Sequence, residues 1–297
     1  MSAKNQCLIT VAIPSYNHAN YIEKCIESIA SQSWKNIEII IIDDGSKDHS
    51  VEVIQSSIAK YKNHFSAIKT IYRENQGLCK TLNQALDISS GEYFSPIASD
   101  DYFLNEKIEK LVNIFKKNSA SKLSAVYGGV NFIDKNGEAT GRNYKGNNNL
   151  LSFEDFFLFK SWVPAPGALF LTSDLREIGG FNPETKVEDL DILLRLTKNG
   201  KKIFFSNEIV AAYRLHESNT SKNIELMHLN VLKILESYKY HSLYKKAINA
   251  YDCVIFRDFA SKNKVISIKK IKNVFLRLND KRLYQGLFKL FFEWKNK

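Results

Sequence analysis

The sequence lacks the features that mark membrane-spanning and secreted proteins. No apolar run reaches the roughly 18 residues that a membrane-spanning helix needs. The apolar stretch near the amino terminus stops at Pro14, which is too short for a secretory signal. The four cysteines are scattered, with no CxxC pair and no spacing to histidine that is typical of metal ligands. We therefore expect a cytoplasmic protein without a disulfide framework or a zinc site.

Three motifs of well-known enzyme classes are also missing. The sequence contains no GxSxG, no GxGxxG and no GxxxxGK followed by Ser or Thr. Hydride transfer on a dinucleotide fold and P-loop chemistry are therefore disfavoured.

Positive charge is concentrated at one end of the chain. The net charge is +10, but residues 222–297 hold 17 Lys and Arg against 6 Asp and Glu, a balance of +11. Residues 1–221 hold 25 against 26, a balance of −1. A basic tail on a near-neutral body is typical of proteins that bind a polyanionic surface, either a membrane or a nucleic acid.

Strand-like and helix-like segments alternate through the first hundred residues. The strand-like segments are 7–17, 36–48, 67–77 and 92–101, and the helix-like ones are 21–33, 50–61 and 78–89. This alternation with short connections predicts an α/β fold with a mostly parallel, doubly wound sheet. Ligands bind such sheets outside the carboxyl ends of the strands, so the polar residues that follow each strand are candidate site residues.

The second half is less regular. It reads as a strand at 125–134, a flexible loop at 135–149, a short helix at 151–159, a loop running into a strand at 162–171, a helix at 184–200 and one or two strands in 202–221. Beyond residue 222 the pattern is helical, lysine-rich and aromatic. We expect a catalytic domain over 1–221 and a basic helical region over 222–297.

Asp43 and Asp44 follow a continuous β-branched run. Carboxylates at this strand end can accept hydrogen bonds from a base or from ribose hydroxyls. Alternatively, Asp44 or Ser46 caps the helix that begins near Ser50, and this reading is the more typical one for DDGS taken alone.

Asp100 and Asp101 stand side by side at the end of the fourth strand-like segment. Hard oxygen ligands in this position suit Mg²⁺ or Mn²⁺, which would also remove the repulsion between the two charges. The alternative is capping of a helix over 105–118, but Asn105 is already a good cap for that helix.

Two further sets of polar residues lie in the second half. Asp189, beside Glu188, falls in the first turn of a predicted helix, where acidic residues are common and the helix dipole lowers the pKa. It suits a general base only if its surroundings raise the pKa again. Arg214 and His216 are two residues apart, so a strand would place them on one face as a phosphate clamp and a metal ligand or proton carrier.

The order of these segments resembles glycosyltransferase family 2. The similarity spans about residues 8–220 and rests on VAIPSYNHANYIEKCIESIASQSWKNIEIIIIDDGSKDHS (11–50), RENQGLCKTLNQAL (73–86), ASDDYFLNEKIEKL (98–111), EIGGFNPETKVEDLDILLRL (177–196) and AYRLH (212–216). The resemblance implies a GT-A fold and an inverting transfer from a nucleotide-sugar donor.

The resemblance also implies roles on the donor side. Pro14, Tyr16 and Asp44 would line the uridine pocket with Asp43 nearby, and Arg73 would approach the base or the diphosphate. One departure stands out, because many relatives carry Asp-x-Asp-Asp at the metal turn. Here the first of those positions is Ala98, so the ribose contact is weaker or comes from elsewhere.

At the reacting centre, the resemblance implies that Asp100 coordinates Mn²⁺ or Mg²⁺ beside the donor diphosphate, with Asp101 in support. Asp189 would be the base that deprotonates the acceptor hydroxyl. The other implied contacts are His216 and Arg214 to metal or diphosphate, and Glu188 and Trp162 to the acceptor.

The last segment, KRLYQGLFKLFFEWKNK (281–297), repeats Leu283, Leu287, Phe291 and Trp294 at helical spacing among lysines. Such a helix can lie on an anionic membrane surface, at the inner face of a bacterial membrane, or pack against its own domain or a partner.

The resemblance to glycosyltransferase family 2, together with these residues, implies a metal-dependent inverting glycosyltransferase that uses a UDP-sugar and acts on a lipid-linked or oligosaccharide acceptor in O-antigen or capsule synthesis. Three rivals stay open: a nucleotidyltransferase, a nucleic-acid-binding protein that uses the basic tail, and an inactive nucleotide-binding relative. No nucleic-acid partner is expected on the main reading. The sequence does not reveal the sugar or the linkage.

Overall fold

The computed structural model describes residues 6–217, 219, 222–274 and 278–293. These residues form two compact units. The first is built from the described parts of Met1–Phe153, Trp162–Glu184 and Glu188–Asn219, and the second from Glu154–Ser161, Thr185–Val187 and the described part of Thr220–Lys297. Two short segments that are distant in sequence from the carboxyl-terminal region therefore fold with it.

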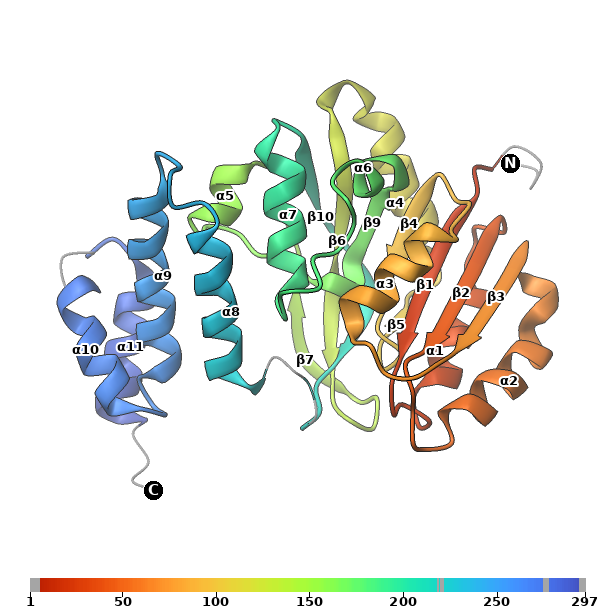
Figure 1. Cartoon of the computed structure of the whole chain (residues 1–297), viewed down its shortest axis with the longest axis horizontal. Coiled ribbons are helices and arrows are strands. Elements are labelled where there is room, and N and C mark those ends of the chain that lie inside the picture. Colours follow the sequence, from red (N-terminus) through yellow and green to blue (C-terminus); the bar gives the residue numbers. More distant parts are fainter. Residues whose placement is uncertain (1–5, 218, 220–221, 275–277, 294–297) are drawn as a thin grey trace. The chain divides into compact units, whose positions relative to one another are not determined.

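The strands of the first unit form one sheet (Figure 1). Their bounds are β1 Ile9–Ser15, β2 Ile37–Asp43, β3 Ala67–Tyr72, β4 Tyr93–Pro96, β5 Tyr102–Phe103, β6 Leu123–Ile133, β7 Ala139–Tyr144, β8 Asn149–Leu151, β9 Ala168–Leu171 and β10 Lys202–Arg214. The main order is β3-β2-β1-β4-β9-β6-β10-β5, with β7 beside β6 and β8 beside β10.

Most of the long strands share one direction. β1 pairs in parallel with β2 and β4, and β2 does so with β3. β9 is antiparallel to both β4 and β6, so β6 again runs with β4, and β10 is parallel to β6. The predicted mostly parallel sheet is confirmed, and one edge of it collects the carboxyl ends of these parallel strands.

Helices cover both faces of this sheet (Figure 1). In the first unit their bounds are α1 Ile22–Ala30, α2 Ser50–Tyr61, α3 Leu78–Asp87, α4 Lys107–Lys117, α6 Thr172–Glu177 and α7 Glu188–Lys198, with short 3-10 turns at Lys62–His64, Ser119–Ser121 and Ala165–Gly167. The short helix α5 Phe153–Phe157 belongs, apart from its first residue, to the second unit. The apolar residues of α1 that recur at helical spacing, Ile22, Cys25, Ile26 and Ile29, are all buried. The β-branched run of β2 is buried along its whole length, as expected for a strand covered on both faces.

Residues 135–149 are not the flexible loop that the sequence predicts. β7 lies in this stretch and pairs with β6, and β8, which begins at its last residue, pairs with β10. All residues of β7 except Tyr144 are exposed, so the strand shows no alternation of buried and exposed side chains. Its order comes from backbone hydrogen bonds to β6, and these leave no trace in side-chain composition.

Two predicted helix caps are also wrong. α4 begins at Lys107 without a side-chain cap, while the Asn105 carbonyl accepts a hydrogen bond from Ser33 N at 3.0 Å. The first turn of α2 is held by Asp48, whose Oδ1 accepts from Ser50 N at 3.0 Å. Asp44 and Ser46 face other partners, because the turn after β2 folds back on itself before α2 begins.

The second unit is helical. Its longer helices are α8 Ile224–Glu236, α9 Tyr244–Phe259, α10 Lys264–Val274 and α11 Lys281–Phe292. Their apolar cluster comprises Cys253, Phe256, Ala260, Val274, Leu283 and Leu290. Gly286 permits the close packing of α11 on α9, because a Cβ there would lie 2.4 Å from the Phe256 ring. Among the helices that the structure describes, none is both long enough and apolar enough to cross a membrane.

The predicted apolar face of the last helix divides in two. Leu283 is buried and Leu287 is partly buried against the apolar cluster, whereas Phe291 is 71% exposed. Trp294 lies outside the described residues. The face that α11 leaves uncovered carries Tyr284, Phe288, Phe291 and Phe292. We call these four residues the aromatic face of α11.

Candidate functional site

The predicted site residues of the amino-terminal half meet at one edge of the sheet. Ser15, Asp43 and Tyr72 lie side by side in register at the ends of β1, β2 and β3. Hydrogen bonds continue one step further, from Asp44 N to the Ser15 carbonyl at 2.8 Å and from Arg73 N to the Asp43 carbonyl at 3.2 Å. The carboxyl edge therefore holds both acidic residues and Arg73.

Asp43 shapes the turn that follows β2. Its Oδ1 accepts from Ser46 N at 2.9 Å, and its Oδ2 accepts from Ser46 Oγ at 2.6 Å and from Ser15 Oγ at 3.2 Å. Gly45 has a φ of 81°, and a Cβ there would lie 2.8 Å from Asn75 N. The carboxylate is thus used to fix a tight turn against the loop after β3.

Asp44 joins β2 to the start of α3. Its Oδ1 accepts from Arg73 Nη1 and from Gln76 N, and its Oδ2 accepts from Gly77 N at 2.8 Å. The Arg73 guanidinium also donates to Gln84 and Thr81 on α3. A carboxylate offers about four lone pairs, so Asp44 retains room for one more donor.

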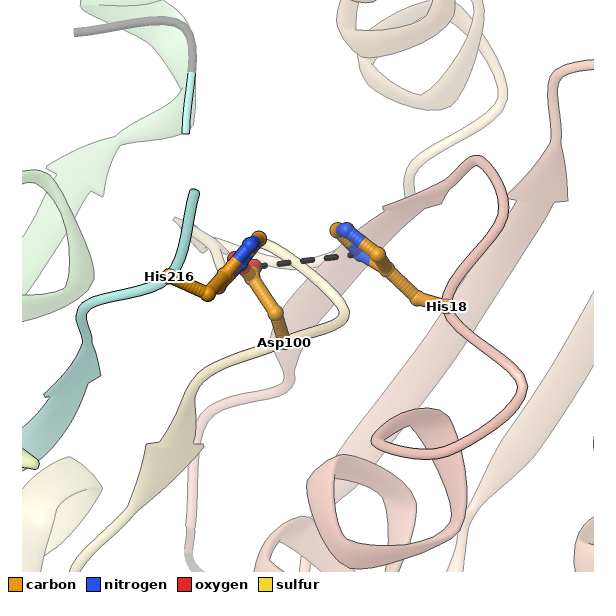
Figure 2. A group of neighbouring side chains, drawn as sticks. All are labelled: His18, Asp100 and His216. Carbon is orange, nitrogen blue, oxygen red and sulfur yellow. Dashed lines mark hydrogen bonds and ion pairs between the residues drawn. The ribbon is translucent and has the colours of Figure 1, made fainter. Parts of the chain in front are cut away.

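Three loops bring His18, Asp100 and His216 together (Figure 2). Asp100 Oδ2 lies 2.7 Å from His216 Nε2, and Asp100 Oδ1 lies 3.9 Å from His18 Nδ1. Asp100 Oδ1 is buried and has no hydrogen-bond partner. One nitrogen of each ring and one carboxylate oxygen all lie within 4.8 Å of one another. The sequence predicted two members of this cluster and missed His18.

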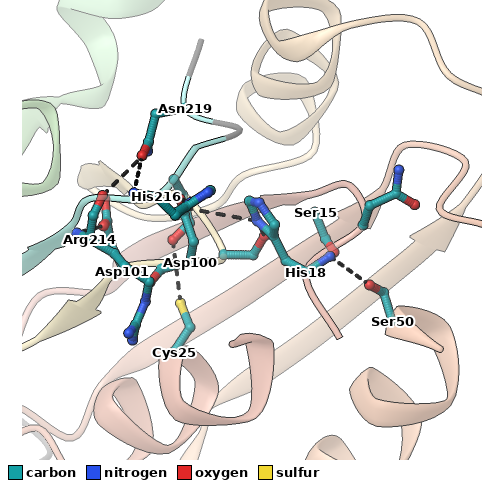
Figure 3. A network of polar contacts seen from close by, with 12 residues as sticks. Ser15, His18, Cys25, Ser50, Asp100, Asp101, Arg214, His216 and Asn219 are labelled. Carbon is teal, nitrogen blue, oxygen red and sulfur yellow. Dashed lines mark hydrogen bonds and ion pairs between the residues drawn. The ribbon is translucent and has the colours of Figure 1, made fainter. Parts of the chain in front are cut away.

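The loop that carries His18 is fastened to the loop before α2. His18 N donates to Ser50 Oγ at 2.9 Å, as Figure 3 shows, and Ala19 N donates to Asp48 Oδ2 at 3.0 Å. Asn17, in the left-handed region with φ 55°, accepts from Lys47 N through its side chain at 2.7 Å. These bonds place the His18 ring at the strand ends.

The loop after β10 is held in a similar way. His216 N donates to Asn219 Oδ1 at 2.6 Å (Figure 3). The Tyr21 ring stacks on His216 with 5.6 Å between centroids, and the Arg214 guanidinium lies 4.6 Å from the Tyr21 centroid. Tyr21 therefore positions two predicted site residues. In the sequence it looks only like the residue before a helix, so no signal singled it out.

Asp101 and Arg214 hold the loops together. The Asp101 carboxylate is buried and accepts from Arg214 N at 2.7 Å. Burial and the neighbouring Asp100 charge raise the pKa of Asp101 well above its usual range. Arg214 Nε donates to the Asp100 carbonyl at 2.8 Å, and Nη1 donates to the carbonyls of Asp134 and Lys135. β10 ends at Arg214, so the prediction that Arg214 and His216 share a strand face is wrong.

Asp189 and Glu188 open α7. Asp189 Oδ1 accepts from Leu190 N at 2.7 Å, and burial raises the pKa of Asp189 above its usual range. The condition that a general base requires, a raised pKa, is therefore met. Among the described residues, no hydrogen bond or ion pair links Asp189 to the histidine–aspartate cluster.

Two of the remaining predicted site residues, Tyr16 and Trp162, are partly exposed aromatic side chains. Tyr16 is 47% exposed just beyond β1, next to the half-buried Pro14. Trp162 is 42% exposed and lies 4.9 Å from Tyr144 between ring centroids. The Tyr144 hydroxyl donates to the Trp162 carbonyl at 3.0 Å, which fixes the loop before β9.

Lys107 is a buried cation that the sequence did not single out. Its Nζ donates to Ser95 Oγ and to the Pro166 carbonyl, both at 2.9 Å, and lies 3.5 Å from the Phe103 ring centroid. Burial lowers its pKa well below the usual value. Lys107 thus ties β4 to the loop after Trp162.

The model of the glycosyl transferase family 2 matches residues 10–167, just over half of the chain. The chain belongs to glycosyl transferase family 2. An uncharacterised glycosyltransferase of Rickettsia conorii is 32% identical over 224 residues, covering 73% of this chain and 35% of the relative. A chondroitin synthase of Pasteurella multocida is 26% identical over 261 residues, covering 87% and 26%. This family 2 chain thus spans about a third or less of the length of these curated relatives.

Solved structures show the same fold for this family 2 chain. Residues 1–349 of S. aureus TarS, crystallised with UDP-GlcNAc, match with a TM-score of 0.64 and 17% identity, covering 95% of this chain and 80% of that one. The mannosyltransferase PcManGT from Pyrobaculum calidifontis, in complex with GDP-Man and Mn²⁺, matches with a TM-score of 0.60 and 15% identity, covering 99% and 89%. The fold is therefore GT-A, with helices at the carboxyl-terminal end.

Proposed function

We propose that this chain is an inverting glycosyltransferase that moves a sugar from a UDP-sugar to a hydroxyl group of a lipid-linked or saccharide acceptor. The acceptor would belong to surface-polysaccharide synthesis, such as an O-antigen or a capsule. The observation that carries the proposal is the cluster of His18, Asp100 and His216 at the carboxyl edge of a GT-A sheet. Complexes of TarS with UDP-GlcNAc and of PcManGT with GDP-Man support a nucleotide-sugar donor.

The residues at this edge fit a divalent cation, Mn²⁺ or Mg²⁺. Asp100 Oδ1 is a buried carboxylate oxygen without a donor, and such an atom is costly unless a cation or a proton reaches it. Asp100 and His216 would hold the ion, with Asp101 and Arg214 fixing their loops. A bound dication would neutralise charge on the departing nucleoside diphosphate.

Base recognition is assigned to Pro14, Tyr16 and Asp44. Tyr16 offers an exposed aromatic ring for stacking, and Asp44 Oδ2 has a lone pair free to accept an N–H of the base. Arg73 supports this arrangement through its bond to Asp44. Ala98 is exposed at the turn before Asp100, so its methyl group gives the ribose no hydrogen-bond partner.

Asp189 is assigned as the base, with Glu188 and Trp162 on the acceptor side. The Asp189 carboxylate takes the proton of the acceptor hydroxyl as the acceptor oxygen bonds to the anomeric carbon. The bond from that carbon to the diphosphate oxygen breaks on the opposite face of the sugar, and the configuration inverts. The raised pKa of Asp189 supports this role, because a more basic carboxylate takes the proton more readily.

A membrane surface is assigned to the aromatic face of α11. Its four aromatic side chains are each more than half exposed, and Lys281 and Lys289 stand on the same helix. Aromatic rings with adjacent lysines suit the interface of an anionic bilayer, and residues 222–297 carry a charge of +11. Residues 1–221 would then perform the transfer at the inner face of the membrane.

A thermal-shift screen of nucleotide sugars with and without Mn²⁺ tests the donor proposal. We expect a UDP-sugar to raise the melting temperature with Mn²⁺ and to do so much less with EDTA. Asp100→Asn should remove the metal-dependent part, whereas Asp87→Asn, an exposed position at the end of α3, should keep it. Metal-dependent UDP binding with neither transfer nor donor hydrolysis would instead identify an inactive relative and refute the enzyme proposal.

A further inference from the structure

His18 faces the same carboxylate as His216, but from the other side of the cluster. Its Nδ1 lies 3.9 Å from Asp100 Oδ1, the oxygen that has no hydrogen-bond partner. Asp100 Oδ2 instead faces His216 Nε2 at 2.7 Å. Figure 2 shows the two rings on opposite sides of the carboxylate. Each carboxylate oxygen is thus directed toward one imidazole.

The spacing leaves room for an ion between the three side chains. First-row divalent metals bind ligand nitrogen and oxygen atoms at about 2.0–2.2 Å, so two ligand atoms of one ion lie at most about 4.4 Å apart. The three ligand atoms here lie within 4.8 Å of one another without an ion, so small side-chain movements would complete the site.

The His18 ring is oriented by several contacts. Ser99 Oγ lies 2.8 Å from His18 Nδ1, and the backbone N of His18 is bound to Ser50 Oγ. The Tyr21 ring packs edge-on against His18 with 5.8 Å between centroids. Ser99 contacts Nδ1, the same ring nitrogen that faces Asp100 Oδ1, so Nδ1 would exchange Ser99 for the ion when it binds.

We propose that His18 is a third protein ligand of the cation, which makes the site two imidazoles and one carboxylate. Imidazole nitrogen binds first-row transition metals, of which Mn²⁺ is the weakest binder, more strongly than it binds Mg²⁺, which prefers oxygen ligands and keeps most of its water. The chain therefore prefers Mn²⁺ to Mg²⁺ and binds Mn²⁺ without a nucleotide. This inference rests on the metal site of the proposed function and adds a residue and a selectivity to it.

The test measures Mn²⁺ binding to the full-length, nucleotide-free protein by electron paramagnetic resonance titration. His18→Phe keeps a ring of similar size beside Tyr21 and removes both nitrogens. We expect it to weaken Mn²⁺ binding by about tenfold or more, and to weaken Mg²⁺ binding less. The matched control is His49→Phe, at a position whose side chain is 89% exposed, which should bind Mn²⁺ as the unaltered protein does.

Electron spin-echo envelope modulation counts the imidazoles on the bound Mn²⁺ directly. We expect couplings from two histidine nitrogens in the unaltered protein and from one in His18→Phe. If the bulk of phenylalanine disturbs the fold, His18→Ala serves instead, and we expect it too to show couplings from one histidine nitrogen. Circular dichroism in EDTA reports whether each variant is folded.

The outcomes separate this inference from the proposed function. Unchanged affinity and unchanged nitrogen couplings in a folded His18→Phe protein, together with loss of binding in Asp100→Ala, would overturn the role of His18 and leave the metal site standing. Absence of Mn²⁺ binding in the unaltered protein, with or without UDP, would overturn both.

Discussion

Burial disfavours the charged form of Asp189 in the folded protein. Burial raises the pKa of Asp189 above the ordinary value of an aspartate, although Asp189 lies in the first turn of α7, where the helix dipole lowers the pKa. Between the pKa of the unfolded chain and the raised pKa of the folded protein, the folded state binds more protons. The free energy of unfolding therefore falls as the pH rises through this range.

Replacing Asp189 by Asn should separate activity from stability. Without a base, transfer should fall by at least about 100-fold, because general base catalysis typically contributes that much. At neutral pH, Asp189→Asn should melt at a higher temperature than the unaltered protein, and this difference should shrink as the pH falls toward the pKa of an ordinary Asp. Steady-state kinetics and thermal melts over a range of pH measure both effects.

Asp191 supplies the control, because it lies on the same helix but is paired with Arg195 at 2.7 Å. Asp191→Asn should lower the melting temperature. If Asp189→Asn protein kept full transfer activity, Asp189 could not be the base. If it also melted below the unaltered protein at neutral pH, the burial argument would fail.

Some residues of the candidate site could be predicted from the sequence and others could not. Asp100 and His216 follow strand ends, and their residue types suit a metal, so both could be predicted. His18, Tyr21 and Lys107 could not, because each sits in a local pattern that most often means a loop, a helix start or a surface lysine. Their roles depend on partners that only the folded chain brings near.

At the scale of elements, α11 presents two different faces. Leu283 and Leu290 are buried against the second unit's apolar cluster, while the aromatic face of α11 is exposed. Substituting exposed side chains should therefore leave folding intact and test binding alone. Full burial of one Phe side chain is worth about 1.5–3 kcal/mol, so two should contribute strongly to binding at a bilayer interface.

Phe288→Ser combined with Phe291→Ser should weaken binding to vesicles that contain anionic phosphatidylglycerol by about tenfold or more. Vesicle co-sedimentation measures this, and added salt should weaken the binding of the unaltered protein further. Tyr240→Ser, at a 93% exposed position outside α11, should have little effect. Equal vesicle binding by the double variant and the unaltered protein would rule out this face as the membrane contact.

Elements were predictable where burial followed a local period. The continuous β-branched run of β2 predicts a strand that is buried on both faces. The helical spacing of apolar residues in α1 predicts a helix with one buried face. β7 had no such signal, because its side chains are exposed and its order comes from pairing with β6. Helix starts failed for a related reason, since Asn105 and Ser46 were drawn into tertiary contacts.

At the scale of the whole molecule, the second unit includes a segment from the middle of the chain. The Phe157 ring lies 5.4 Å from Tyr238, and the Phe159 ring lies 4.7 Å from Tyr251, between centroids. Both tyrosines belong to the carboxyl-terminal helices. These contacts could not be predicted from the sequence, because the pattern of residues 151–159 is that of any short apolar helix.

Removing residues 222–297 should therefore damage the protein rather than release an intact catalytic domain. The truncation leaves Phe157 and Phe159 without their partners, so we expect lower soluble yield and a lower melting temperature than for the full chain. Expression trials and thermal melts measure this. A truncated protein that was as soluble and as stable as the full chain would show that these contacts contribute little.

The position of the histidine–aspartate cluster also has a consequence for the order of folding. His216 and Asp100 are 116 residues apart in sequence, and His18 and Ser99 are 81 apart. Contacts that close such long loops form late, because the local helices and strand pairs must first lower the entropy cost of closing the loop. The cluster joins the loops after β1, β4 and β10, so it can exist only once these strands have been assembled into one sheet. Capture of a metal ion there would mark the end of folding, and the rate at which a refolding chain takes up Mn²⁺ would time the completion of the sheet.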